Sequence, residues 1–293
     1  MRAMREELEP DLVRIRAPNP GPLTGTGTNT YILGSADRVV IDPGPDHDGH
    51  LEALLAETEG AIAAILVTHS HLDHSLLVPR LKEATGADVY AFGPSGAGQS
   101  DIMRDLAKDS DIGGSEGADP AFRPDVTLAD GEAVTLSGQT IRALHTPGHF
   151  GNHLCFEWRS AFFSGDHVMG WATTLVSPPH GDLTDFMASC RRLAASEHRI
   201  FYPGHGDLIS DPALRLAELM AHRTGRENQI QSALRDGPRT ARELTEAIYT
   251  DVSESLWPAA ERNVLAHLID LTARNIAAPE GLLTRHSVFS LKG

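Results

Sequence analysis

Apolar positions in the first two thirds of the chain fall into short runs separated by polar and glycine-rich stretches. Three stretches, residues 50–58, 76–86 and 183–196, repeat apolar residues at helical spacing. The other runs are rich in β-branched and aromatic residues and predict strands over residues 38–42, 61–69, 87–93, 133–138, 140–146, 153–158, 161–166 and 199–205. Strands mixed with helices in this way predict an α/β fold in which helices cover the sheets.

Residues 211–293 have a different pattern. Asp211 and Pro212 supply an N-cap and a first-turn proline for a helix over 211–235, and Thr240–Glu243 forms a capping box for a helix over 240–249. A third helix is predicted over 257–275, and two short β candidates, 276–285 and 286–292, follow it. Three helices and a hairpin indicate a winged-helix-like module. We therefore predict one domain over residues 1–210 and a winged-helix-like domain over residues 211–293.

The composition narrows the class of protein. Of the 293 residues 41% are apolar and 22% are charged, which excludes wholesale disorder. No apolar run reaches the roughly 18 to 20 residues that cross a bilayer, and the opening residues do not resemble a secretory signal, so we expect no membrane partner. Two cysteines provide no disulfide framework and fit a reducing cytosol, which predicts a cytoplasmic location.

The charge is acidic and unevenly distributed. The net charge is −15, and residues 223–293 carry nine basic and nine acidic residues, so the whole surplus falls in residues 1–222. This acidic surplus disfavours a broad surface for nucleic acid or for an anionic membrane.

Histidines point to a specific chemistry. The chain has 15 histidines, and a run of four potential ligands, His69, His71, Asp73 and His74, follows the apolar run 64–67 at the end of a predicted strand. Imidazole nitrogens and carboxylate oxygens suit zinc, and also iron or manganese. The alternative is an exposed polar loop or a helix-capping cluster. The same arrangement recurs, because a glycine and then a His or Asp end three further β runs, at His149, Asp166 and His205. The repetition favours a metal centre.

These motifs resemble the metallo-β-lactamase superfamily over roughly residues 12–210. With the segments NPGPLTGTGTNTYILG (19–34), HTPGHFGNH (145–153) and YPGHG (202–206) and the C-terminal module, the chain is similar to the β-lactamase-like protein 2 group over almost its whole length. The resemblance implies an αββα sandwich with the metal site at one edge between the two sheets.

The resemblance also implies a ligand set. Two divalent metal ions, with zinc favoured, would be bridged by Asp166, the first held by His69, His71 and His149 and the second by Asp73, His74 and His205. Asp42 matches an acidic motif of the superfamily and is expected to orient a ligand. Its alternative role is to cap the turn at Pro43 and Gly44.

Other candidates receive different interpretations. We expect His145 to be structural or to support a ligand, since the motif favours His149. For His153, substrate contact and plain packing stay open, and His180 is expected to be an exposed loop histidine. Cys155 is expected in the core. Residues 94–125, around one helical candidate at 100–110, are interpreted as a functional cover or a mobile segment.

The expected ligand set determines the expected chemistry. Two divalent cations lower the pKa of a shared water from about 15.7 toward about 7 and supply hydroxide that attacks a carbonyl carbon or phosphorus. Asp73 is a ligand and also our candidate catalytic residue, for orienting the nucleophile or moving its proton. The Gly-rich stretch 25–30 precedes a strand and is interpreted as a tight turn near the site.

The substrate is less determined, because one fold hosts many activities. The first hypothesis is hydrolysis of a small ester, thioester or lactone. The second, implied by the resemblance, is an endoribonuclease that cuts single-stranded RNA. The third is a winged-helix nucleic-acid-binding regulator with a structural metal site. An enclosed apolar pocket would favour the first, and basic side chains at the mouth would favour RNA. A homodimer is a possible assembly.

Overall fold

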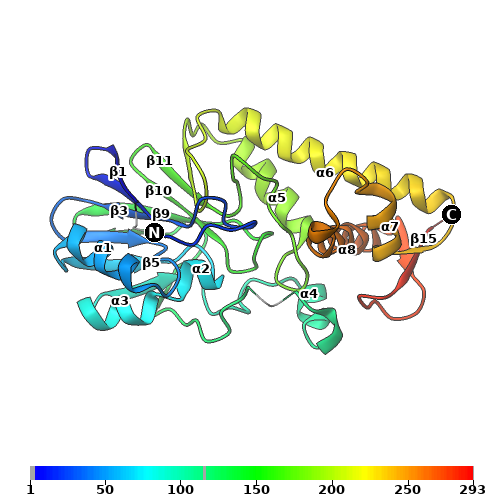
Figure 1. Cartoon of the computed structure of the whole chain (residues 1–293), viewed down its shortest axis with the longest axis horizontal. Helices are drawn as coiled ribbons and strands as arrows, with labels where there is room; N and C mark the ends of the chain where they lie inside the picture. Colours follow the sequence, from blue (N-terminus) through cyan, green and yellow to red (C-terminus); the bar gives the residue numbers. More distant parts are fainter. Residues whose placement is uncertain (1–3, 115–116, 293) are drawn as a thin grey trace.

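The first two thirds of the molecule are built on two β-sheets (Figure 1). The computed structural model describes residues 4–114 and 117–292. The first sheet holds seven strands in chain order: β1 (Met4–Glu9), β2 (Leu12–Arg16), β3 (Asn29–Leu33), β4 (Arg38–Ile41), β5 (Ile62–Leu66), β6 (Asp88–Ala91) and β7 (Val126–Thr127). The second has the order β12-β11-β10-β9-β8, with β8 (Ala133–Leu136), β9 (Gln139–His145), β10 (Leu154–Trp158), β11 (Ala161–Gly165) and β12 (Phe201–Pro203).

Helices cover the outer face of each sheet. Leu54 of α1 (Asp48–Thr58) and Leu81 of α3 (Val78–Thr85) pack on the first sheet, with the short α2 (Leu72–Ser75) between them in the chain. Phe186 of α5 (Leu183–Ala194) packs on the second sheet. The layers are therefore α, β, β and α, and the expected αββα sandwich is confirmed.

Strand alternation produces the core between the sheets. Val39 and Ile41 of β4 point into the inter-sheet cluster, and Val40 between them points toward the helices. In the second sheet Phe156 points inward and Cys155 points toward α5. Period-two alternation of apolar residues on both faces is what a sheet covered on both sides requires.

The C-terminal module begins where its capping signals predict. Asp211 caps α6 (Pro212–Arg235), and its carboxylate accepts a hydrogen bond from the Leu214 amide at 2.9 Å. Thr240 and Glu243 form the expected capping box at α7 (Ala241–Ile248). The module is completed by α8 (Trp257–Ala273) and a small sheet of β13 (Arg239–Thr240), β15 (Val288–Leu291) and β14 (Ala277–Pro279). The three helices and the hairpin expected for the winged-helix-like module are all present.

The module shares its apolar cores with the rest of the chain. Figure 1 shows α6 extending from the sheets to the far end of the module. Leu216 of α6 and Ala266 of α8 belong to the cluster that contains Phe186 of α5. Met103 of α4 (Asp101–Leu106) packs with Val264 of α8. The domain division at residue 210 stays a prediction, and apolar packing crosses it in two places.

Some elements differ from the expectation. Sequence patterns did not predict β1, β2, β7 or β13. In β2 the alternation is hidden by Arg14, which is only 5% exposed because it donates to the Gly206 carbonyl at 3.1 Å. The helix expected over 100–110 ends at Leu106, because the Asp109 carboxylate caps a separate 3-10 turn at Ser110–Ile112. Within residues 94–125, Met103, Leu106 and Ile112 are packed in the core, so the described part is not a loose segment.

Candidate metal centre

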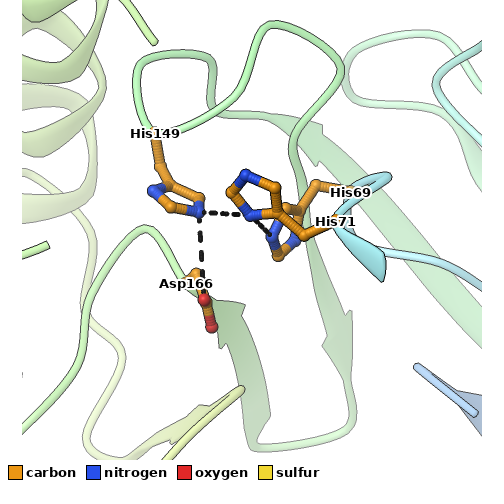
Figure 2. A group of neighbouring side chains, drawn as sticks. All are labelled: His69, His71, His149 and Asp166. Carbon is orange, nitrogen blue, oxygen red and sulfur yellow. Dashed lines mark hydrogen bonds and ion pairs between the residues drawn. The ribbon is translucent and has the colours of Figure 1, made fainter. Parts of the chain in front are cut away.

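The first ligand group contains His69, His71, His149 and Asp166 (Figure 2). His69 and His71 follow β5, His149 follows β9, and Asp166 follows β11, so all four leave strand ends at one edge of the sandwich. The Nε2 atom of His69 lies 2.9 Å from Nδ1 of His71, which lies 3.0 Å from Nε2 of His149. Asp166 Oδ2 is 3.8 Å from His149 Nε2.

The second ligand group contains Asp73, His74 and His205. Asp73 and His74 lie in α2, directly after His71, and His205 follows β12. The Nε2 atoms of His74 and His205 are 3.3 Å apart, and Asp73 Oδ2 lies 3.1 Å from His205 Nε2. Asp166 also reaches this group, at 3.5 Å from His74 and 3.2 Å from His205. It therefore lies between the groups, where a bridging ligand would have to lie.

The glycines before these ligands permit the close approach that the sequence pattern suggested. A Cβ on Gly204 would stand 2.3 Å from Asp166 Oδ1, and one on Gly148 would stand 2.2 Å from the Phe186 backbone. Both contacts are shorter than any side chain tolerates. Glycine at these positions lets His205 and His149 approach the other ligands.

Hydrogen bonds fix which nitrogen each histidine presents. Carbonyl oxygens only accept, so His149 Nδ1 donates to Leu175 O at 2.7 Å and His205 Nδ1 to Gly27 O at 3.3 Å. His74 Nδ1 lies 2.9 Å from Asp42 Oδ2, to which it donates. The Thr68 hydroxyl donates to the same carboxylate at 2.7 Å and therefore accepts from His69 Nδ1 at 3.0 Å. In each of these four rings Nδ1 thus carries a proton, and Nε2 is the nitrogen that faces the other ligands.

The donor set fits divalent cations. Zinc bonds imidazole nitrogen at about 2.0–2.1 Å, which places tetrahedral ligand atoms about 3.3 Å apart. The nitrogen separations of 2.9, 3.0 and 3.3 Å are close to that spacing. Asp166 Oδ1 is buried without a hydrogen-bond donor, which is costly for a carboxylate unless a cation supplies the partner.

Burial and charge act differently on the two groups. Burial lowers the pKa of His69 well below its usual value and the pKa of His71 to about 3, so both rings are neutral. Burial also acts on His205, but Asp166 and Asp73 outweigh it and raise its pKa to about 9. Burial would raise the pKa of Asp73, yet the neighbouring His74 and His205 hold it below the usual range, so this carboxyl is ionised. Neighbouring carboxylates therefore affect the histidine pKa values of the second group more than those of the first.

A cavity of about 560 Å³ lies over the two groups. Its walls come from both parts of the chain, with Leu23 before β3, Trp171 after β11 and Pro258 and Ala259 of α8. Trp171 packs against Gly25 and Gly206, where added Cβ atoms would stand 3.2 and 2.5 Å from its indole ring. Leu23 and Trp171 keep 61% and 44% of their surface exposed, so they present apolar surface at the cavity.

The Gly-rich stretch 25–30 forms a turn at the site, as expected. Thr28 pairs with His205 as an isolated bridge, and its hydroxyl donates to Asp73 Oδ2 at 3.1 Å. The Asp73 side chain is 27% exposed and lines the cavity. This arrangement leaves Asp73 oriented by Thr28 and accessible from the cavity.

Asp42 takes the supporting position that was expected. Its carboxylate accepts from the Thr68 amide and hydroxyl, both at 2.7 Å, and from His74. Asp42 has a φ of +52°, which a residue other than glycine adopts at a cost, and the three hydrogen bonds offset that cost. The alternative role as a turn cap is therefore not its main one.

The remaining candidates lie outside both groups. His145 Nε2 donates to Gly151 O at 2.9 Å, and its ring stacks on Phe92. His153 is fully buried behind the site, where Nδ1 lies 2.9 Å from the Thr146 hydroxyl, which supports packing over substrate contact. Cys155 is buried, as expected.

The expectation for His180 was wrong. Its ring stacks on Phe150 at 4.7 Å and lines the cavity, because the 166–180 loop folds back over the site.

Several residues of the site were not predicted. Thr68, Thr28 and the carbonyl of Leu175 orient ligands, and Leu23 and Trp171 form cavity walls. Thr68 had a usable signal, since it directly precedes His69 at the strand end. A backbone carbonyl has none, because any residue type supplies one.

Comparison with known proteins agrees with this geometry. The model of the metallo-beta-lactamase superfamily matches residues 23–205, and that of the beta-lactamase associated winged helix domain matches residues 240–284. A Beta-lactamase-like protein 2 homolog of Drosophila melanogaster is 31% identical over 90% of this chain and 88% of its own length. An atrochrysone carboxyl ACP thioesterase of Aspergillus fumigatus is 32% identical over 88% of this chain and 81% of its own.

A solved structure has the same arrangement throughout. The crystal structure of a metallo-beta-lactamase family protein from Thermus thermophilus has a TM-score of 0.79 and 26% identity, and the match covers 98% of this chain and 100% of that one. Within the described residues, none of the helices has the length and apolar character needed to span a bilayer.

Proposed function

The chain belongs to the metallo-β-lactamase superfamily, and from that premise we propose a hydrolase with two divalent cations, zinc by its donor set, that cleaves a small thioester, ester or lactone. The proposed substrate class rests on one observation, the largely apolar cavity over the two ligand groups. A compact acyl group fits a cavity of about 560 Å³.

The proposed ligands are the residues that the geometry brings together. His69, His71 and His149 would hold the first cation, and Asp73, His74 and His205 the second, with Asp166 shared. When bound, the two cations would activate water at neutral pH and polarise the substrate carbonyl. Imidazole and carboxylate donors in this number suit zinc, and the same set accepts iron or manganese.

The chain itself contributes orientation and proton transfer. Asp73 Oδ2 accepts from the Thr28 hydroxyl and faces the cavity, so it is placed to orient an attacking water and to accept its proton. Leu23, Trp171 and Ala259 supply apolar surface that would hold an acyl chain and exclude bulk water. Binding of the acyl chain to this apolar surface would position the substrate carbonyl next to the two ligand groups.

The arginines at the cavity do not form a track for RNA. Arg262 donates to Ser177 Oγ at 3.0 Å and to the carbonyls of Ile112 and Gly113, so its guanidinium is engaged with the protein. Arg285 Nε lies 3.7 Å from Glu261. A single-strand binder needs basic side chains directed at phosphates and aromatic platforms for bases. The engagement of Arg262 with the protein supports an acyl substrate over single-stranded RNA.

Relatives favour a thioester among the acyl substrates. The Aspergillus fumigatus relative is an acyl-carrier-protein thioesterase by name, and it is similar to this chain over both parts. A thioester carbonyl also needs less activation than an amide, which suits attack by a water activated by two cations. The participation of α8 in the cavity wall supports an enzyme over a regulator that reads DNA. The homodimer and the cytoplasmic location stay predictions.

The test compares substrate classes on one preparation. Zinc-loaded protein is assayed on a panel of acyl thioesters, esters and lactones and on labelled single-stranded RNA, each with and without chelator. We expect chelator-sensitive hydrolysis of a medium-sized acyl thioester and no RNA cleavage above that of the Asp166→Asn variant. RNA cleavage that exceeds acyl hydrolysis would replace this proposal by the ribonuclease.

A further inference from the structure

The 166–180 loop has no regular secondary structure and yet carries parts of the metal centre. It begins with Asp166, and the carbonyl of Leu175 accepts the hydrogen bond from His149 Nδ1 at 2.7 Å. Trp171 and Leu175 line the cavity. Irregular backbone of this length holds a fixed position only if other elements bond to it.

Two side chains of the C-terminal module bond to the backbone on either side of Leu175. Arg223 of α6 donates from one Nη atom to the Thr174 carbonyl and from the other to Asn263 Oδ1 at 2.9 Å. Asn263 of α8 accepts on the same oxygen from the Val176 amide at 3.1 Å. The peptide groups before and after Leu175 are therefore both held by helices that follow residue 211.

The loop also holds its own first residues. The Thr174 hydroxyl donates to the carbonyls of Asp166 at 2.9 Å and of His167 at 3.1 Å. Arg215 of α6 fixes the middle of the loop, because it donates to Met169 O and Ala172 O, both at 2.7 Å. The loop is thus anchored along most of its length by module side chains.

Arg223 is unusual in its surroundings. It is 2% exposed, its guanidinium lies 5.3 Å from the Phe186 ring centroid, and burial lowers its pKa to about 10. A buried guanidinium carries a large desolvation cost. Plain packing between α5 and α6 would be served by an apolar side chain, so the hydrogen bonds to Thr174 and Asn263 are its distinguishing contribution.

We propose that Arg223 and Asn263 are positioning residues of the first ligand group: they hold Leu175 where its carbonyl fixes the tautomer and the direction of His149. The inference rests on the proposed ligand role of His149. The winged-helix-like module is then a structural part of the metal centre, in addition to a wall of the cavity. Removal of an outer partner of a metal-bound histidine costs about 10- to 100-fold in metal affinity.

The test measures zinc release from the zinc-loaded full chain to a chromophoric chelator. The variants are Asn263→Leu, which removes the shared acceptor, and Asn263→Asp, which keeps it. Arg223→Met removes the donor, and Arg226→Met is the control, because Arg226 lies one turn along α6 and donates to Gln229 and Ile248. The release phase that disappears in His149→Ala identifies the first site, and that lost in His205→Ala the second.

We expect Asn263→Leu and Arg223→Met to weaken the first site about 10- to 100-fold and to change the second by less than about 3-fold. Asn263→Asp and Arg226→Met should stay within about 3-fold of the wild type at both sites. Equal weakening of both sites, or an unchanged first site in a folded Asn263→Leu protein, would overturn the inference. If the wild type releases no zinc in a phase that depends on His149, the proposed ligand set fails instead, so the two failures are distinguishable.

Discussion

The two ligand groups lie side by side but depend on different parts of the chain. In the second group, His74 is supported by Asp42 at the end of β4 and His205 by the turn before β3. Both supports belong to the sandwich. In the first group, His69 is also supported from the sandwich through Thr68, while His149 depends on a loop carbonyl held by α6 and α8.

The groups differ in charge as well. Burial leaves His69 and His71 with a lowered pKa, whereas Asp73 and Asp166 raise the pKa of His205 against its burial. A neighbouring carboxylate favours both a proton and a metal ion on a histidine, and the two compete for the same lone pair. The proposed binuclear centre would therefore have one side supported from within the sandwich and one side supported by the C-terminal module.

Asp166→Asn should impair both ligand groups, because Asp166 contacts both. An amide is a poor bridge between two cations, so we expect kcat/KM on the preferred acyl substrate to fall by more than about 100-fold, beyond the usual effect of an outer partner. Steady-state kinetics and elemental analysis measure it, with about two metals per wild-type chain expected. Asp185→Asn, a carboxylate of α5 outside both groups, is the control. Full activity in Asp166→Asn would refute the shared role.

His205→Ala and His149→Ala should separate the groups. Each variant loses one ligand of one site, so we expect His205→Ala to weaken the second site and His149→Ala the first, each by more than the effect of an outer partner. Zinc release to a chelator reports both sites in one experiment, and each variant serves as the control for the other. Unchanged catalysis in His205→Ala would show that the second cation is not needed.

Asp42→Asn should weaken the second site more than the first, because Asp42 supports His74. The amide no longer accepts from Thr68 and His74 together, and we expect the second site to weaken about 10- to 100-fold with a smaller effect on the first. Asp46→Asn in the same loop removes an exposed carboxylate paired with Arg80 and should leave both sites unchanged. A larger loss at the first site than at the second would contradict the assignment of Asp42 to His74.

Trp171→Ala should affect neither ligand group and report on the cavity alone. We expect KM for a medium-sized acyl substrate to rise about 10-fold, which corresponds to about 1.4 kcal/mol, with kcat within about 3-fold. Leu256→Ala is the control, since this leucine is exposed and does not line the cavity. A fall in kcat with an unchanged KM would mean that Trp171 acts on the metal centre.

The proposed ligands were predictable because their signal is local. His69, His71, Asp73 and His74 lie within six consecutive positions, and the other three follow glycines at strand ends. The hydrogen-bond partner of His149 could not be predicted, since it is a backbone carbonyl 26 residues away in an irregular loop. The role of Arg223 was equally hidden, because α6 packs its arginine against a loop 49 residues earlier in the chain. Side-chain identity carries information, and backbone acceptors do not.

The strands were likewise predictable only where the signal is local. Strands β4 and β10 have continuous or alternating apolar residues and were predicted close to their true ends, whereas β5 ends at Leu66, three residues before its predicted end. Strand β2 was missed because Arg14 and Arg16 occupy positions that polarity assigns to solvent. Their guanidiniums bond to Gly206 and to Asn29 across the sheet, so tertiary contacts place charged residues where the pattern predicts none.

The packing of α4 against α8 has a consequence for synthesis. Met103 and Leu106 are completed by Val264 and Leu268, about 160 residues later in the chain. The ribosome releases residues 101–106 long before α8 exists, so these apolar side chains stay in water while the rest is translated. These side chains of α4 are therefore exposed on the nascent chain until α8 has been translated, and transiently exposed apolar surface of this kind favours aggregation during synthesis.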